Sequence, residues 1–450
     1  MTLFSGGPIV HNNNTEINTY FFKEEIMRIF ENSESRVRGY VRSFPVIFKS
    51  AKGAYMVDEM DKTYVDFFAG AGTLNYGHNN ERITQAMIEY LQSDGILHGL
   101  DMATIAKQKF MQKFYDTILD PRNLEYKMQF TGPTGTNAVE TALKLARMVK
   151  GRSNIVAFTN GYHGLTMGAL AVTGNNFYRD EAYISRSNVS FLPYDGYMGP
   201  DFNTLDLFRK LLIDNSSGLD LPAAVILETI QAEGGVNIAS SNWLKGLAEL
   251  CREFDILLII DDIQVGNGRT GDFFSFEESG IKPDMITLSK AIGAGLPLAL
   301  LLMRPDLDQW KPGEHTGTFR GNNLAFIASH QALHYWDNPE LSEAVKYKGA
   351  VMEKELLEIA KKYPELNAEV RGRGMIWGLE IPERGLCSRI SETCFENGLV
   401  IELAGADDQV VKFLPPLIID KETLLKGIGI VEQSIKTILE EKNANRTGEF

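Results

Sequence analysis

The sequence predicts an α/β fold, with a mostly parallel sheet in a large domain and a smaller α+β lobe made from both chain ends. Short apolar strands alternate with helical segments between about residues 80 and 320, which is typical of a parallel sheet covered by helices. An antiparallel strand pattern precedes this region, and helices followed by strands come after it. We therefore expect residues 71–325 to form the large domain, and residues 1–70 and 326–450 to form the small one.

Before the large domain, the pattern predicts one helix and an antiparallel sheet. Residues 1–20 show no regular pattern, whereas residues 21–35 have the apolar spacing of a helix. Glycines at residues 70–77 mark a loop, which a structural turn explains equally well. The strands are expected at residues 46–48, 54–58 and 64–68, with a turn at 59–62.

Within and after the large domain, the expected elements follow from apolar runs and helical spacing. The strands of the large domain are expected at residues 127–130, 154–158, 223–227, 256–261, 285–288 and 298–303. The later elements are helices at 324–336 and 340–362, strands at 375–380, 399–401 and 410–414, and a closing helix at about 421–441. The polar end from residue 443 onward is expected to fray.

Composition and charge exclude several classes of protein. The chain has 450 residues, of which 44% are hydrophobic and 23% charged, so it can bury the core of a two-lobed globular protein. Its net charge of −14 argues against nucleic acid or an anionic membrane as a partner. The sequence has no apolar run of membrane-spanning length, and its three cysteines suit a reducing compartment. The asparagine-rich first residues lack the pattern of a signal peptide, so none is expected. We expect a cytoplasmic protein that acts on small molecules.

Two strand ends carry the most informative side chains. Lys290 follows the apolar run 285–288 and precedes a glycine turn, and Asp261 closes the apolar run 256–260. Loops at strand ends are where α/β sheets place their chemistry. A lysine and an acid there suggest a pyridoxal phosphate site, with Lys290 as the Schiff base and Asp261 on the pyridinium nitrogen. A structural ion pair is the alternative.

A glycine- and threonine-rich turn at residues 131–137 joins the strand at 127–130 to an amphipathic helix. Such a turn leaves backbone N–H groups free to receive an anion at the helix N-terminus. The turn lacks the Gly-Lys-Ser/Thr ending of a nucleotide P-loop, so a cofactor phosphate is the expected ligand. An ordinary helix cap has a similar sequence.

Other polar and aromatic residues also follow the predicted strands. Tyr162 could stack on a flat cofactor ring, whereas the adjacent His163 could equally be a hydrogen-bonded loop histidine. Glu228 and Glu233 could be catalytic acids or charge partners, and a structural role for Glu228 stays open.

One pair of histidines has the spacing of metal ligands. His330 and His334 have the i, i+4 spacing of metal ligands on a helix, but no third ligand is evident in the sequence. No metal is therefore expected.

Several motifs in a fixed order resemble the class III pyridoxal phosphate aminotransferases of fold type I. They are Asp-Asp-Ile-Gln at 261–264, Gly-Arg-Thr-Gly at 268–271, Ser-Lys at 289–290 and Gly-Thr-Phe-Arg-Gly-Asn at 317–322. The resemblance covers about residues 40 to 435. A narrower resemblance to the diaminobutyrate transaminases of that class is carried by residues 42–45, 66–72, 74–80, 129–140 and 312–315.

The resemblance implies a role for each residue around the cofactor ring. Lys290 would hold the cofactor and shuttle the proton of the substrate carbon. Asp261 would pair with the pyridinium nitrogen, and Gln264 would hydrogen-bond the ring oxygen. Ile263 would pack on one face of the ring and Tyr162 on the other.

The resemblance also implies the phosphate contacts and the subunit arrangement. Gly135 and Thr136 would hold the phosphate, and Thr318 would reach it from a neighbouring subunit, so the active site would belong to a homodimer or higher homo-oligomer. Glu233 and Lys412 are expected to bind the substrate. Lys412 lies where the class commonly has an arginine for the glutamate α-carboxylate. Leu165 follows Gly164 directly, at the position where class III relatives that use 4-aminobutyrate or ornithine commonly carry an arginine for a substrate carboxylate.

The activity implied is transfer of an amino group from L-glutamate to aspartate 4-semialdehyde through pyridoxamine phosphate. The products would be L-2,4-diaminobutyrate and 2-oxoglutarate, and the reaction would be the first step of ectoine synthesis. Alternatives are another ω-aminotransferase acting on 4-aminobutyrate, ornithine or a polyamine, and diaminobutyrate supply for a siderophore. An aminomutase or racemase on the same scaffold and a non-catalytic binding protein are further alternatives.

Overall fold

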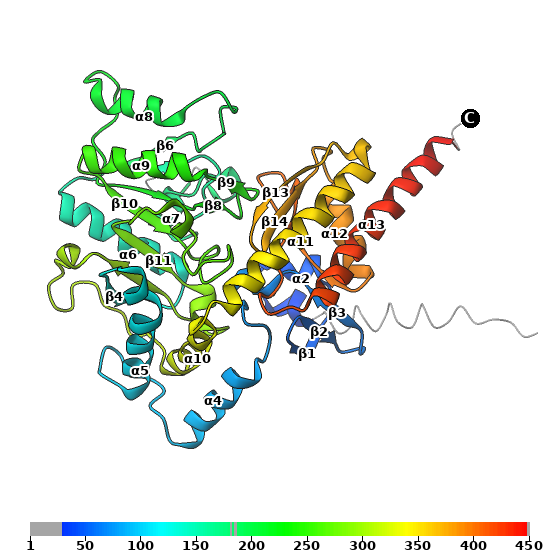
Figure 1. Ribbon diagram of the computed structural model, residues 1–450, viewed down its shortest axis with the longest axis horizontal. Coiled ribbons are helices and arrows are strands. Elements are labelled where there is room, and N and C mark those ends of the chain that lie inside the picture. The colour runs from blue at the N-terminus through cyan, green and yellow to red at the C-terminus, as the bar shows by residue number, and fades with distance from the viewer. Residues whose placement is uncertain (1–28, 181, 184–186, 448–450) are drawn as a thin grey trace, which may run out of the picture.

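The computed structural model describes residues 29–180, 182–183 and 187–447 (Figure 1). Figure 1 shows a larger lobe in which helices surround a sheet, and a second lobe where the blue N-terminal strands lie beside orange and red C-terminal elements. Of the helix predicted over residues 21–35, residues 29–33 are helical, and the part before them lies outside the described residues, as do residues 1–20. None of the described helices is long and apolar enough to cross a membrane.

The largest sheet in the described part of the chain has seven strands in the order β4-β12-β11-β10-β7-β5-β6. All strands run parallel except β12, which is antiparallel to both of its neighbours. Every strand predicted for this region is present. The strands are β4 (Lys127–Phe130), β5 (Ile155–Phe158), β6 (Val189–Leu192), β7 (Ala224–Leu227), β10 (Leu257–Asp261), β11 (Met285–Leu288) and β12 (Leu300–Met303).

The central strands are buried on both faces, which explains their continuous apolar sequences. In β10, Leu257 and Ile259 pack in the core that contains helix α6 (Gly135–Lys150). Leu258 and Ile260 pack in a second core, which contains helix α9 (Ser241–Glu253). Successive side chains of a strand point to opposite faces, so the two cores cover the two sides of the sheet.

The second lobe joins the two chain ends through strand pairing. Its first sheet has the order β1-β2-β3-β15, in which β15 lies parallel to β3 and Leu399 pairs with Val65. Its second sheet has the order β13-β14-β17-β16 and is antiparallel. The strands are β1 (Phe48–Lys52), β2 (Tyr55–Asp58), β3 (Thr63–Asp66), β13 (Glu369–Arg373), β14 (Ile376–Glu380), β15 (Leu399–Val400), β16 (Glu402–Ala404) and β17 (Val410–Phe413). The proposed domain boundaries at residues 70 and 325 stay predictions.

Six strands differ from the sequence prediction, and each of them lies at the edge of its sheet. The strand expected at 46–48 begins only at Phe48 and continues through the polar residues of β1. β6, β13 and β16 were not predicted, and all three are edge strands. The two-stranded sheet of β8 (Ile230–Gln231) and β9 (Asn237–Ile238) was not predicted either. An edge strand is partly exposed and tolerates polar side chains, so its sequence lacks a continuous apolar run.

The main helices outside the central sheet follow the helical spacing of the sequence. Helix α11 has the predicted limits, and the expected helix 324–336 is α10 followed by a 3-10 turn. The closing helix α13 runs on to Thr447, so fraying from residue 443 is wrong for residues 443–447, because adding residues to an existing helix needs no new nucleation. The helices are α2 (Tyr40–Ser43), α4 (Glu81–Gln92), α5 (Ile105–Phe114), α7 (Met167–Ala171), α8 (Thr204–Ile213), α10 (Asn323–Leu333), α11 (Glu340–Lys362), α12 (Leu386–Glu396) and α13 (Lys421–Thr447).

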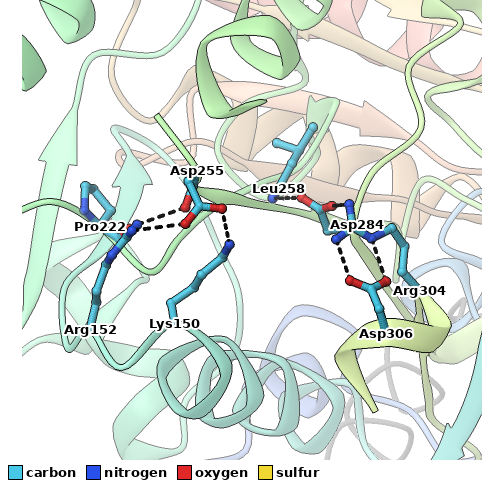
Figure 2. A network of polar contacts seen from close by, with 8 residues as sticks. All are labelled: Lys150, Arg152, Pro222, Asp255, Leu258, Asp284, Arg304 and Asp306. Carbon is cyan, nitrogen blue, oxygen red and sulfur yellow. Dashed lines mark hydrogen bonds and ion pairs between the residues drawn. The ribbon is translucent and has the colours of Figure 1, made fainter. Parts of the chain in front are cut away.

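Ion pairs connect the loops at the amino edge of the parallel strands (Figure 2). Asp284 precedes β11, pairs with Arg304 at 2.7 Å and accepts a hydrogen bond from the backbone N–H of Leu258 at 2.7 Å. Asp255 precedes β10 and pairs with Arg152 just after α6 at 3.1 Å. This network fixes one edge of the sheet, and the candidate site lies at the opposite, carboxyl edge.

Candidate active site

A cavity of about 400 Å³ lies at the carboxyl ends of the parallel strands. Its volume falls within the range of roughly 300–1,000 Å³ that is typical of small-molecule sites. Nearly all of the residues predicted for the site line this cavity. They are Gly135, Thr136, Tyr162, Glu233, Asp261, Ile263, Gln264 and Lys290.

Sheet register brings the acid and the lysine together. Asp261 is the last residue of β10 and pairs with Thr287 of β11, and Lys290 follows β11 after Ser289. Lys290 has a φ of +50°, a left-handed conformation that costs a lysine on the order of 1–2 kcal/mol. Burial lowers the pKa of its amino group, which favours the neutral amine that a nucleophile requires.

The Asp261 carboxylate is held by hydrogen bonds on both oxygens. Oδ2 accepts from Nδ1 of His163 at 2.7 Å, and Oδ1 accepts from the Thr287 hydroxyl at 3.1 Å. Burial alone would lower the pKa of His163, but the hydrogen bond and charge of Asp261 outweigh burial and raise it. His163 is therefore a hydrogen-bonded histidine whose partner is the predicted cofactor acid, a contact that sequence reasoning missed.

The turn before α6 meets the cavity at the helix N-terminus. Thr134 is the N-cap, and its hydroxyl donates to Oδ1 of Asn137 at 2.8 Å. The first N–H groups of any helix lack partners within the helix, so they are available to an anion. A Cβ added at Gly135 would lie 2.9 Å from Cδ1 of Ile263, so a larger residue here would displace the Ile263 side chain that lines the cavity.

The polar groups of the cavity wall fit pyridoxal phosphate. Nε2 of Gln264 donates to the Ala71 carbonyl and to Oε1 of Glu233, each at 2.9 Å. Its Oε1 is buried and has no hydrogen-bond partner in the described part of the chain, so it can accept from the hydroxyl of the cofactor ring. With Asp261 for the ring nitrogen and the N-terminus of α6 for the phosphate, each polar group of the cofactor has a complementary partner.

The residues after β5 and β7 line another side of the cavity. The backbone N–H of Tyr162 donates to Oε2 of Glu228 at 3.0 Å. Burial raises the pKa of Glu228 to about 8, so this carboxyl is largely protonated at neutral pH. The ring of Tyr162 packs edge-on against Tyr178, which also lines the cavity, with centroids 5.7 Å apart.

An ion cluster lies beside the cavity. Nζ of Lys412 is 2.8 Å from Glu233 and 2.6 Å from Glu402, and Lys412 is fully buried. Burial raises the pKa of Glu233, but the charges of Lys412 and Lys290 together lower it to about 2. The opposite charges of Glu233 and Glu402 raise the pKa of Lys412 despite its burial. Lys412 itself does not line the cavity and lies behind Glu233.

Three residues of this region were not predicted from the sequence. Tyr40 and Tyr178 line the cavity, and Glu402 pairs with Lys412 from the neighbouring strand. A signal existed for Glu402, because a lone carboxylate interrupts the apolar run that follows residue 398. The tyrosines carry no such signal.

Two further residues singled out in the sequence, Thr318 and Leu165, are exposed. Thr318 is exposed and outside the cavity, and its carbonyl accepts from Nε2 of His98 at 3.0 Å. Its predicted contribution to a neighbouring subunit stays a prediction. Leu165 lines the cavity, and 48% of its surface is exposed. It thus occupies the position at which the family resemblance implies an arginine in some relatives.

The histidine pair considered for a metal lies away from this cavity. The rings of His330 and His334 pack edge-on with centroids 5.2 Å apart, and His334 pairs with Asp337 at 2.7 Å. The described residues contain no group of three or more metal-binding side chains of His, Cys, Asp or Glu.

Comparison with known proteins agrees with the geometry of the site. The family profile described as aminotransferase class-III matches residues 38–435. The diaminobutyrate–2-oxoglutarate transaminase of Wolinella succinogenes is 65% identical over 94% of this chain and 99% of that protein. The corresponding enzyme of Bordetella parapertussis is 55% identical over 92% of this chain and 96% of that protein.

Solved structures support the same fold. The ornithine aminotransferase of Toxoplasma gondii, which contains pyridoxal phosphate at partial occupancy, has a TM-score of 0.80 and 25% identity. That alignment covers 96% of this chain and 100% of the other. An S-selective transaminase from Arthrobacter has a TM-score of 0.82 at 23% identity over 93% of this chain and 99% of that one, a likeness of fold.

Proposed function

The chain belongs to the class III aminotransferases, and from this premise we propose that it transfers the amino group of L-glutamate to aspartate 4-semialdehyde. The products are L-2,4-diaminobutyrate and 2-oxoglutarate. The observation that carries the proposal is the 65% identity, along almost the whole of both chains, to a relative named diaminobutyrate–2-oxoglutarate transaminase. We place the reaction first in ectoine synthesis, with diaminobutyrate supply for a siderophore as the second candidate.

The enzyme uses pyridoxal phosphate, the cofactor of this family. When bound, the cofactor supplies an aldehyde that takes up the amino group and a ring that withdraws electrons from the reacting carbon. The proposed contacts are Gly135 and Thr136 with the phosphate, Asp261 with the ring nitrogen and Gln264 with the ring hydroxyl. Ile263 and Tyr162 would flank the ring.

Lys290 has two tasks in this proposal. Its Nζ binds the cofactor, and after exchange with substrate it removes the proton from the reacting carbon and returns it. The lowered pKa of Lys290 supports the second task, because it increases the share of the free amine, the form that can accept a proton. The charge of Asp261 is kept beside the ring by His163 and Thr287.

The proposed assembly is a cytoplasmic homodimer or higher homo-oligomer. In this arrangement Thr318 of each chain contacts the phosphate in its neighbour. Its exposure outside the cavity of its own chain supports such a role. The active site would then be complete only in the oligomer.

The cavity wall supports a diamino acid better than 4-aminobutyrate. No arginine lines the cavity in the part of the chain that the structure describes, and Leu165 lines it instead, directly after Gly164. The far carboxylate of 4-aminobutyrate would be left beside leucine without a cation, which is costly. Diaminobutyrate carries the same carboxylate, but its α-ammonium provides a compensating charge and can meet Glu233.

We therefore expect diaminobutyrate to exceed 4-aminobutyrate as amino donor by at least about a hundredfold in kcat/KM, a little under 3 kcal/mol. Ornithine should fall between them, because chain length alone discriminates weakly. The measurement is the initial rate with each donor and 2-oxoglutarate as acceptor. Comparable efficiency with 4-aminobutyrate would replace this proposal by a general ω-aminotransferase.

A second prediction concerns the pair between Glu233 and Lys412. We propose that Glu233 neutralises Lys412 while the diamino acid is bound and turns away when the glutamate α-carboxylate arrives. Lys412→Ala should then raise KM for glutamate more than KM for diaminobutyrate, by roughly 1–3 kcal/mol of lost charged contact. The measurement is KM for both donors. Equal effects on the two KM values would show that Glu233 does not release Lys412 for the glutamate carboxylate.

Lys412→Arg is the matched control, because it keeps the charge and should preserve most of the affinity for glutamate. Removing Lys412 also leaves the buried carboxylate of Glu402 and the partly buried one of Glu233 without their cation. A loss of roughly 3–5 kcal/mol in the free energy of unfolding is therefore expected for Lys412→Ala, and thermal denaturation separates it from the effect on KM.

A further inference from the structure

Lys412 has one carboxylate partner more than its charge requires. Glu402 of β16 lies opposite Lys412 of β17 in the antiparallel register, and the two side chains form an ion pair at 2.6 Å. Glu233 approaches the same ammonium at 2.8 Å from a different part of the chain. Glu402 is nearly as buried as Lys412, with 6% of its side chain exposed. When both acids are ionised, the cluster therefore carries a net charge of −1.

The second carboxylate changes what happens when Glu233 turns away. With Glu233 as its only partner, Lys412 would become a free cation and could receive a substrate carboxylate. With Glu402 ionised, the departure of Glu233 still leaves Lys412 neutralised at 2.6 Å. An incoming carboxylate would then meet no net positive charge in a buried site. Binding a carboxylate here therefore requires Glu402 to lose its charge.

The cluster acts on the cavity through residues that line it. Glu233 is part of the cavity wall, and Nε2 of Gln264 donates to its Oε1 at 2.9 Å. Tyr40 also lines the cavity, and its hydroxyl donates to Oε2 of Glu402 at 3.4 Å. Glu402 does not line the cavity, so its charge acts on the cavity through Glu233, Lys412 and Tyr40.

We infer that Glu402 is a positioning residue whose proton decides which substrate charge this end of the cavity accepts. When Glu402 is ionised, the net negative cluster favours the non-reacting ammonium of a diamino acid. When Glu402 is protonated, Lys412 becomes available to the carboxylate of a dicarboxylic amino acid. The inference deepens the proposed function and rests on it. A proton from solvent enters Glu402 when the dicarboxylate binds and leaves when the diamino acid binds.

The surroundings of Glu402 suit such a change of charge. Burial raises its pKa to about 7, although the neighbouring charge of Lys412 opposes the rise. The charged or titratable groups that act on it are Lys412 on β17, Glu233 after β8 (Ile230–Gln231), Lys290 after β11, Tyr40 on α2 and Tyr178. A carboxylate brought beside Glu402 raises its pKa further, and an ammonium lowers it.

The test uses the holoenzyme and glutarate, a dicarboxylate of the length of glutamate that has no amino group to react. Calorimetric titration at pH 8 in two buffers of different ionisation enthalpy measures the protons taken up on binding. We expect close to one proton per site in the wild type and a clear reduction in Glu402→Gln. Because glutamine is always neutral, the variant should also bind glutarate about tenfold more tightly at pH 8, the factor expected for a group with a pKa of about 7.

Glu369→Gln is the matched control, because Glu369 belongs to the same lobe with 71% of its side chain exposed and should leave proton uptake unchanged. Uptake that persists in Glu402→Gln would assign the proton to another buried acid and overturn the inference. If Glu402→Gln does not fold, the pH dependence of proton uptake by the wild type tests the inference instead. This uptake should fall between pH 8 and pH 6.5, and constant uptake or none would overturn the inference.

Kinetics separate this inference from the proposed function. At pH 8, Glu402→Gln should lower the ratio of kcat/KM for diaminobutyrate to that for glutamate by about tenfold, through KM and with little change in kcat. If the wild type uses 4-aminobutyrate and diaminobutyrate with equal kcat/KM, that result would contradict the proposed function and leave the glutarate result unaffected. A wild type that prefers diaminobutyrate but takes up no proton with glutarate would contradict only the role of Glu402.

Discussion

Lys290→Ala is expected to abolish transamination and to leave the cofactor without a covalent link to the protein. The partly buried Lys290 lines the cavity, and no other lysine does so in the described part of the chain. Loss of both its bond to the cofactor and its proton transfer should lower kcat/KM on the order of 10⁴-fold or more, at least about 5 kcal/mol.

The measurement combines absorbance with peptide mapping. Borohydride reduction of the wild type should fix the cofactor to the peptide that contains Lys290, and the variant should yield no labelled peptide. Lys282→Ala, at an exposed position before β11, serves as the control and should keep both the label and the activity. Full turnover together with a lysine-linked absorbance in Lys290→Ala would show that another residue carries the cofactor.

Asp261→Asn is expected to have the second largest effect. Asparagine keeps the shape of the side chain but removes the negative charge that stabilises a protonated ring nitrogen. We expect kcat to fall between a hundred- and a thousandfold, about 3–4 kcal/mol, as for removal of one well-placed electrostatic group. The variant should also lower the pKa of His163, because the hydrogen bond and charge of Asp261 are what raise it.

Asp262→Asn is the matched control for this prediction. Asp262 does not line the cavity, and its Oδ2 accepts from the backbone N–H of Ser275 at 3.1 Å, a contact that the amide oxygen of asparagine can keep. Burial raises the pKa of Asp262 to about 7, so its negative charge is already incomplete near neutral pH. Rates for both variants at pH 7.5 decide the assignment, and equal losses would mean that Asp261 is not the partner of the ring.

The sequence alone was sufficient to predict the central sheet and the residues at its carboxyl edge. A parallel strand buried on both faces requires a continuous apolar run, and the run ends where polar groups reach the cavity. That local rule located Asp261 after β10, Lys290 after β11 and the Gly135 turn after β4, and all three line one cavity. The same rule failed at β6 and β13, since edge strands are partly exposed and need no apolar run.

Only the tertiary structure decided which of these residues meet and which lie behind others. His163 is 98 residues from Asp261 in the chain, and Tyr40 is 362 residues from Glu402. Lys412 pairs with Glu233 and lies behind it, and it shares its charge with Glu402, which the sequence did not indicate as a partner. Such contacts depend on how strands from distant segments pack against one another, and a local pattern carries no record of that packing. The charge at this end of the cavity is therefore a property of the folded chain, set by burial and by the distances between three side chains.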